Sequence, residues 1–143
     1  MSLFSALGVS ASGMSAQRTR AELLVENLAN AETTRTPEGG PYRRKDAVFA
    51  ESGHYSPFGS IFQAQVGSAV EVSEIVEDMR DPDKRYQPGH PDADKEGYVS
   101  YPRLSPAEEM VDLMSASRGY HANISAMTAV KDMLQKSLDL LRT

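Results

Sequence analysis

The sequence predicts a mainly α-helical chain in which long N- and C-terminal helices form a coiled-coil layer, with a small β-containing insert between them. Apolar residues recur at alternating spacings of three and four near both ends of the chain, while Gly and Pro are concentrated in the middle. A 3.5-residue apolar repeat forms a narrow stripe along one side of a helix, and that stripe needs a partner helix. The expected segments are an N-terminal helix over residues 1–34, an insert over 35–104 and a C-terminal helix over 105–143.

The N-terminal helix is expected to begin after Ser2 and to end near Ala31. Gly8 and Gly13 weaken its first half by roughly 0.5–1 kcal/mol each relative to alanine. The Thr36-Pro37 dipeptide stops any further helix, because the residue before proline is pushed out of the helical region. We call the heptad-spaced apolar row on each terminal helix the seam. In the N-terminal helix the seam consists of Phe4, Leu7, Ala11, Met14, Ala21, Val25 and Leu28.

The insert is expected to contain loops and short strands. Alternating apolar and polar residues predict strands, and Gly67-Ser68 is expected to form a tight turn between two of them. The density of Asp, Pro and Gly over residues 81–97 predicts turns there. The strand candidates are residues 46–51, 60–66, 69–77 and 97–101.

The C-terminal helix has a clear start. Ser105 to Glu108 form a capping box with Pro at the first helical position. Glu108 and Glu109 are assigned to the cap and to the helix dipole, which favours negative charge in the first turn. A helix from Pro106 to Arg142 is about 55 Å long and must project from a chain of this size. Its seam consists of Met110, Leu113, Tyr120, Ile124, Met127, Leu134, Leu138 and Leu141.

Each seam can meet the other terminal helix or a helix of a neighbouring subunit. Two features argue against a hairpin contained within one chain. The N-terminal helix is rich in Gly and Ser, and the C-terminal helix has a second apolar edge at Val111, Met114 and Val130. A helix that is apolar on two sides suits a packed array of subunits. Burial of each large apolar seam residue is worth about 1.5–3 kcal/mol, so neighbouring subunits can fold together what one cannot fold alone.

Composition excludes several classes of function. The absence of cysteine removes thiol catalysis, disulfides and thiolate metal sites. The net charge of −5 and the lack of a basic stripe argue against nucleic-acid binding. No stretch approaches the roughly 20 apolar residues of a membrane span, and the N-terminus lacks the basic region of a secretory signal peptide. We therefore expect no catalytic, cofactor-binding or metal-binding residues and no cofactor.

Three short motifs in the insert need interpretation. The run from Asp92 to Gly97 resembles the opening of a calcium loop, but Arg103 stands where that loop needs a glutamate, so a solvated turn leading into a strand fits better. The run Arg43-Arg44-Lys45 is either a solvated face or a contact to an acidic partner. Phe58 and Phe62 are two aromatic residues four positions apart, which a small insert could use as a core anchor.

Both ends of the chain resemble the bacterial flagellar basal-body rod protein family. The run Asn27-Leu28-Ala29-Asn30-Ala31-Glu32-Thr33-Thr34 is similar to the N-terminal motif of rod and hook proteins, and residues 108–141 are similar to their C-terminal motif. Residues 35–44, 88–94 and 97–99 resemble the proximal rod members of that family. The residues that carry the terminal motifs include Asn27, Asn30, Thr34 and Asn123.

The resemblance implies a structural subunit of the flagellar basal-body rod, with no enzymatic activity. Family members polymerise through their terminal helices into a hollow drive shaft that crosses the periplasm, transmits torque and passes exported subunits. The implied partners are copies of the same chain, other rod proteins, the flagellar export apparatus and basal-body ring proteins. The implied export route leaves no cleaved signal peptide, and Phe58 with Phe62 resembles the short element that related substrates present to the export gate.

Three alternatives remain open at this point. The chain could be another axial rod or adaptor protein of the same family, although the short insert argues against hook and distal rod proteins. It could be a cytoplasmic coiled-coil scaffold. An enzyme of cell-wall remodelling would need a carboxylate pair held near a cleft, for which the insert is small.

Overall fold

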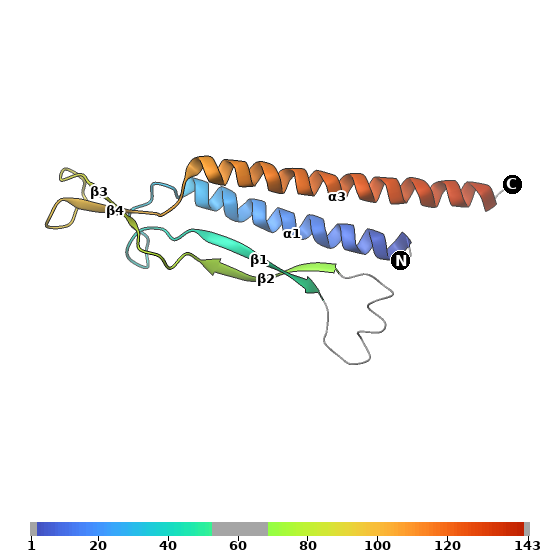
Figure 1. Cartoon of the computed structure of the whole chain (residues 1–143), viewed down its shortest axis with the longest axis horizontal. Coiled ribbons are helices and arrows are strands. Elements are labelled where there is room, and N and C mark those ends of the chain that lie inside the picture. Colours follow the sequence, from blue (N-terminus) through green and yellow to red (C-terminus); the bar gives the residue numbers. More distant parts are fainter. Residues whose placement is uncertain (1–2, 53–68, 142–143) are drawn as a thin grey trace, which may run out of the picture.

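The computed structural model describes residues 3–52 and 69–141. Two long helices, α1 (Leu3–Ala29) and α3 (Pro106–Leu141), lie side by side and antiparallel, so that the N- and C-terminal ends lie toward the same end of an elongated molecule (Figure 1). Within the described residues, four strands form two separate two-stranded antiparallel sheets. The prediction of a mainly α chain with a β-containing insert is confirmed.

The chain leaves α1 through a turn held by its own side chains. The Asn30 side-chain amide donates to the carbonyl of Glu26 at 2.9 Å, and the Thr33 hydroxyl donates to the Asn30 side-chain oxygen at 3.1 Å. The backbone pattern changes at the same place, because the Ala31 N–H donates to the carbonyl of Leu28, three residues back, at 3.3 Å. The helix therefore ends two residues earlier than expected, whereas α3 begins at Pro106 as predicted.

The first sheet consists of β1 (Lys45–Ser52) and β2 (Ala69–Glu77), which we call the long hairpin. It lies along α1 (Figure 1), where the Ser12 hydroxyl accepts a hydrogen bond from the Val70 N–H at 3.1 Å. Ser73 is an extra residue opposite the step from Val48 to Phe49, so it forms a β-bulge. The predicted turn at Gly67-Ser68 implies that the strand over 69–77 pairs with residues 60–66, but in the structure it pairs with β1. Residues 60–66 and Gly67-Ser68 lie outside the described residues.

The second sheet consists of β3 (Asp83–Tyr86) and β4 (Tyr98–Tyr101), at the end of the molecule remote from the termini (Figure 1). The strand at β4 confirms the prediction, while β3 was missed because its sequence lies in the segment dense in Asp and Pro. The turn before β4 is closed by Asp94, whose carboxylate accepts the N–H groups of Tyr98 and Glu96 at 2.8 and 2.9 Å. These two donors lower the pKa of Asp94. The Asp94 carboxylate therefore stabilises the turn, in agreement with the interpretation of residues 92–97 as a solvated turn.

Small residues let the two helices approach closely. A Cβ atom added at Gly13 would lie 3.0 Å from the Asn123 side chain, and one added at Gly119 would lie 3.1 Å from the Gln17 side chain. Ala16 and Ala116 are buried close by along the same helices. Small side chains therefore let α1 and α3 approach closely at Gly13 and Gly119.

Replacing Gly119 with leucine is expected to lower the free energy of unfolding by about 1–3 kcal/mol, because the added side chain has to displace Gln17 from a tight interface. Urea unfolding of the purified chain measures the effect. Gly8 is the matched control, since a Cβ there meets nothing within 4 Å. Gly8→Ala should raise stability by about 0.5–1 kcal/mol through helix propensity alone. Equal effects of the two substitutions would contradict close packing at Gly119.

Candidate assembly surface

The predicted seams lie at the border of the contact between the two helices. Along each helix the seam alternates between positions that are partly buried and positions that face solvent. The partly buried residues are Leu7, Met14, Ala21, Leu28, Leu113, Tyr120, Met127 and Leu134. The exposed residues are Phe4, Ala11, Val25, Met110, Ile124 and Leu138. Leu141 is the last residue of α3.

The stripe of α3 that contacts α1 is shifted by one residue from the exposed seam positions: Glu109 precedes Met110, and Asn123 precedes Ile124. It recurs every seven residues at Glu109, Ala116, Asn123 and Val130, of which all but Asn123 are fully buried. The expectation that a hairpin within one chain was disfavoured is therefore wrong in one respect, because α1 and α3 do pair. It was right that one partner helix does not use all the apolar surface, since three residues of each seam stay exposed.

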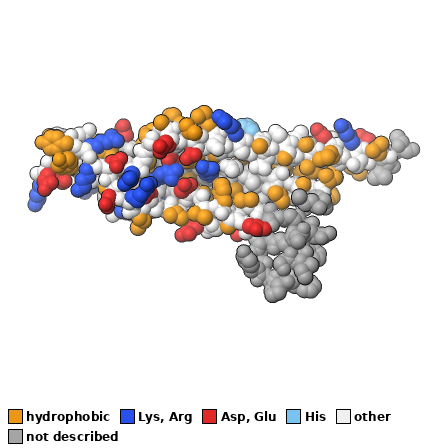
Figure 2. Space-filling model, viewed as in Figure 1, with side chains coloured by type: hydrophobic (Ala, Val, Ile, Leu, Met, Phe, Trp, Pro, Cys, Tyr) orange, Lys and Arg blue, Asp and Glu red, His pale blue; other side chains and the backbone are white. Residues whose placement is uncertain are grey.

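Large apolar side chains gather on the outer surface of α3. Figure 2 shows apolar atoms over the helices on the face that it draws. An exposed apolar patch on a chain of this size marks an interaction surface. The exposed large apolar residues of α3 are Met110, Val111, Met114, Ile124, Met133, Leu138 and Leu140, and those of α1 are Phe4 and Val25. We call this set the outer apolar surface.

A buried polar network joins the helices to the long hairpin. Asn27 is fully buried, at 0% exposure. Its side-chain amide donates to the Lys45 carbonyl at 2.8 Å and to the Glu109 carboxylate at 3.0 Å. Its side-chain oxygen accepts the Tyr42 hydroxyl at 3.0 Å and the Lys45 N–H at 2.9 Å. One side chain thus fixes α1, α3 and the start of β1 relative to one another.

Glu109 carries the charge of this network. Its side chain is 2% exposed, and its Oε1 atom accepts from the Arg44 guanidinium at 2.6 Å. The pKa of Arg44 is raised, because the hydrogen bond and charge of Glu109 outweigh the opposing effect of burial. Burial also raises the pKa of the Tyr42 hydroxyl above its usual range. The assignment of Glu109 to the helix cap and dipole is corrected: its carboxylate points inward, whereas Glu108 is exposed.

The basic run before β1 finds its acidic partners inside the same chain. Arg44 pairs with Glu109, and Lys45 Nζ lies 2.7 Å from Glu26 Oε1. Arg43 is exposed and donates to the carbonyl of Asp78 at 3.1 Å. Of the two interpretations offered for this run, contact with an acidic group holds for Arg44 and Lys45, and exposure holds for Arg43.

The remaining residues of the family motif also make specific contacts. Asn123 packs against Gly13 and donates to the Gly119 carbonyl at 3.0 Å. The Thr34 hydroxyl donates to Asp92 Oδ2 at 2.8 Å, which ties the end of α1 to the turn before β4. Phe58 and Phe62 lie outside the described residues. The sequence reasoning missed the small-residue contact, although Gly and Ala at heptad spacing could have revealed it.

The described residues hold no grouping of three His, Asp or Glu side chains able to bind a metal ion. No helix in this part of the chain is long and apolar enough to cross a membrane. The fold is an antiparallel helix pair that a buried polar network joins to a β hairpin, with large apolar side chains exposed on the helices.

Comparison with known proteins gives the family. Residues 95–140 match the family model described as the C-terminal region of flagellar basal body rod FlgEFG proteins. The chain is 44% identical to the flagellar basal-body rod protein FlgC of Bacillus subtilis, over 98% of this chain and 99% of that protein. FlgC of Borreliella burgdorferi is 39% identical over 99% of both chains, and FlgC of Salmonella typhimurium is 37% identical over 98% of both. The chain belongs to the FlgC family of flagellar basal-body rod proteins, and it is a structural protein of the basal body and not an enzyme.

Proposed function

We propose that this chain polymerises through its terminal helices, with copies of itself and with other rod proteins, into the coiled-coil layer of the proximal rod. In that assembly the segments 1–34 and 105–143 form the inner helical layer, and 35–104 lies outside it. The rod is a hollow shaft in the periplasm that transmits torque and passes exported subunits. The basal-body rings are further proposed neighbours.

The outer apolar surface is the observation that supports this proposal most. Within one chain the packing of α1 on α3 leaves the side chains of this surface exposed to water. Covering one such side chain is worth about 1.5–3 kcal/mol. Helices from neighbouring subunits provide that cover, and the heptad spacing of Met110, Ile124 and Leu138 suits knobs-into-holes packing.

The proposed export route is the flagellar type III apparatus, without cleavage of a signal peptide. The candidate export element is the pair Phe58 and Phe62. The test expresses the chain in a strain that lacks its own copy and follows it in the cytoplasm and in purified basal bodies. We expect the intact chain, with its N-terminus unprocessed, in the basal bodies. Its absence from them would contradict the proposed function.

The same fractionation tests the export pair. Replacing both Phe58 and Phe62 with alanine should trap the chain in the cytoplasm, at normal total amounts. Tyr86→Ala is a control, because it removes an exposed aromatic side chain from β3. If the double variant still reaches the basal bodies at normal levels, the pair anchors a loop and does not direct export.

A further inference from the structure

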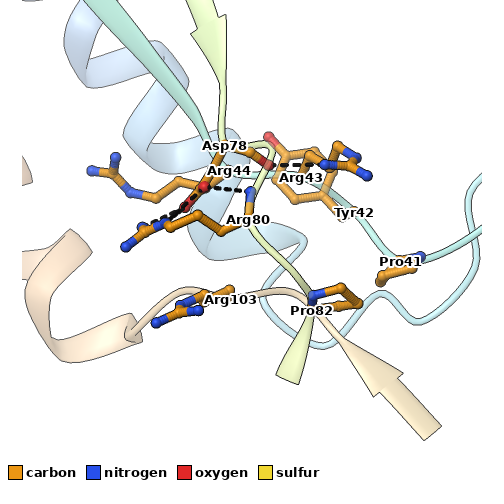
Figure 3. Close-up of a pocket in the computed structure, with 8 residues that line it drawn as sticks. All are labelled: Pro41, Tyr42, Arg43, Arg44, Asp78, Arg80, Pro82 and Arg103. Atoms are coloured by element: carbon orange, nitrogen blue, oxygen red, sulfur yellow. Dashed lines mark hydrogen bonds and ion pairs between the residues drawn. The ribbon is translucent and has the colours of Figure 1, made fainter. Parts of the chain in front are cut away.

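A small arginine-lined pocket lies where the start of β1 meets the segment between β2 and β3 (Figure 3). Its volume is about 50 Å³, less than that of two liquid water molecules and far below that of a small-molecule site. A pocket of this size admits a single carboxylate. The lining residues are Pro41, Tyr42, Arg43, Arg44, Asp78, Arg80, Pro82 and Arg103.

The arginines of this pocket differ in whether a carboxylate forms an ion pair with them. Arg80 pairs with Asp78, and these hydrogen bonds hold the pKa of the Asp78 carboxyl well below its usual range, so that it stays ionised. Arg44 is held by Glu109. Among the described residues, no carboxylate lies within ion-pair distance of Arg43 or Arg103. Figure 3 shows the Arg103 guanidinium on the same side of the pocket as those of Arg44 and Arg80.

The outer face of the long hairpin has the complementary chemistry. Directly opposed residues of an antiparallel pair share a face, so Val48 and Glu74 lie together, as do Ala50 and Glu71. Glu71 and Glu74 are both exposed, and neither forms an ion pair with another described residue. Val48 is exposed beside them at 44%. The face therefore combines two exposed carboxylates, neither of them paired with a described residue, with the apolar side chain of Val48.

We propose that the arginine pocket of one copy receives the Glu74 carboxylate from the long hairpin of a second copy, with the Glu71 carboxylate beside the pocket. Arg103 supplies a guanidinium that forms no ion pair with a described residue, and Pro82 and the exposed Met79 beside Arg43 give apolar surface for Val48 of the hairpin. This contact deepens the proposed function, on which it rests. It adds an interface between the inserts to the one between the helices.

The two surfaces lie at different positions along the molecule. The pocket is lined by residues just before β1, just after β2 and at Arg103, whereas the long hairpin that carries the acidic face runs along α1 (Figure 1). An interface between two different patches is heterologous, and repeated application builds an open helical polymer and not a closed dimer. The geometry therefore suits an axial filament.

The first test reverses the charges of Arg103 and Glu74, singly and together, in cells. Arg103→Glu and Glu74→Lys alone should each lower the amount of chain in basal bodies about tenfold, as expected when one close ion pair becomes a repulsion. Both positions are exposed, so folding should be preserved. The double variant should recover to near the level of the unchanged protein. Normal incorporation of both single variants, or no recovery in the double variant, would overturn the inference.

The absence of cysteine allows a direct second test. A chain with Arg103→Cys and Glu74→Cys should give dimers and higher multimers when basal bodies are treated with a short bis-maleimide. Lys95→Cys with Glu74→Cys is the matched control and should stay monomeric. If the first variant is present in basal bodies but does not cross-link to itself, the pocket does not receive this face. That result leaves the proposed function intact, whereas loss of the unchanged chain from basal bodies refutes the function.

Discussion

Replacing Arg44 with methionine is expected to lower the free energy of unfolding by about 3 kcal/mol. The substitution leaves the Glu109 carboxylate, 2% exposed, without its cation. Breaking a buried ion pair from one side costs about 3–5 kcal/mol, because the remaining charge stays desolvated. The lower end of that range applies here, since Asn27 still donates to Glu109 Oε2 and Arg44 itself is 23% exposed.

Chemical denaturation of the purified chain measures this effect. Arg18→Met is the matched control, because the Arg18–Glu22 pair lies on the surface of α1 and such pairs contribute about 0–1 kcal/mol. The double replacement Arg44→Met with Glu109→Leu should recover much of the loss, as it removes both charges. A loss no larger than that of Arg18→Met would show that the network does not hold the hairpin on the helices.

The second large effect is on assembly and not on folding. Ile124→Asp and Leu138→Asp place a charge on the outer apolar surface, at side chains that are 38% and 60% exposed. In the separate chain the charge stays in water, so the free energy of unfolding should change little, especially at Leu138. In the rod it would be buried without a partner, at a cost of several kcal/mol. Cells should therefore make the protein but fail to swim.

Swimming in soft agar, combined with thermal unfolding of the purified variants, separates the two effects. Lys95→Asp is the control, because it introduces the same side chain in an exposed turn between β3 and β4. It should swim normally. Normal swimming with Leu138→Asp would show that this part of the outer apolar surface stays in water in the rod, and would contradict the proposed helical layer.

Much of the fold could be predicted because strong local signals produce it. The start of α3 follows from the capping sequence before Pro106, and its length from an apolar repeat that only Ser117 and Lys131 interrupt. The end of α1 was predicted only to within two residues, since side chains of the turn itself decide it. The strand β3 lacks both alternation and β-branched residues, and only its pairing with β4 makes it a strand.

The assembly surface was harder to predict. An apolar repeat shows which side chains have to be buried, but it does not show whether the helix that buries them belongs to the same chain or to another. The helices within one chain meet at Gly13, Gly119 and Ala116, which carry almost no hydrophobic signal. The role of Glu109 was misassigned for a related reason. An acidic residue is expected in the first turn of a helix for local reasons. The partner of Glu109 is Arg44, which is 65 residues away in the sequence.

The pairing of the two ends of the chain decides when the chain can fold. Asn27 and Glu109 are 82 residues apart, so a ribosome finishes the first helix long before its partner exists. At about 5–20 residues per second, translation of the intervening chain takes on the order of 4–16 s. An isolated helix with this many Gly and Ser residues is marginal in water. The nascent protein therefore stays open until its last helix emerges, and an open chain is the form that the proposed export route requires.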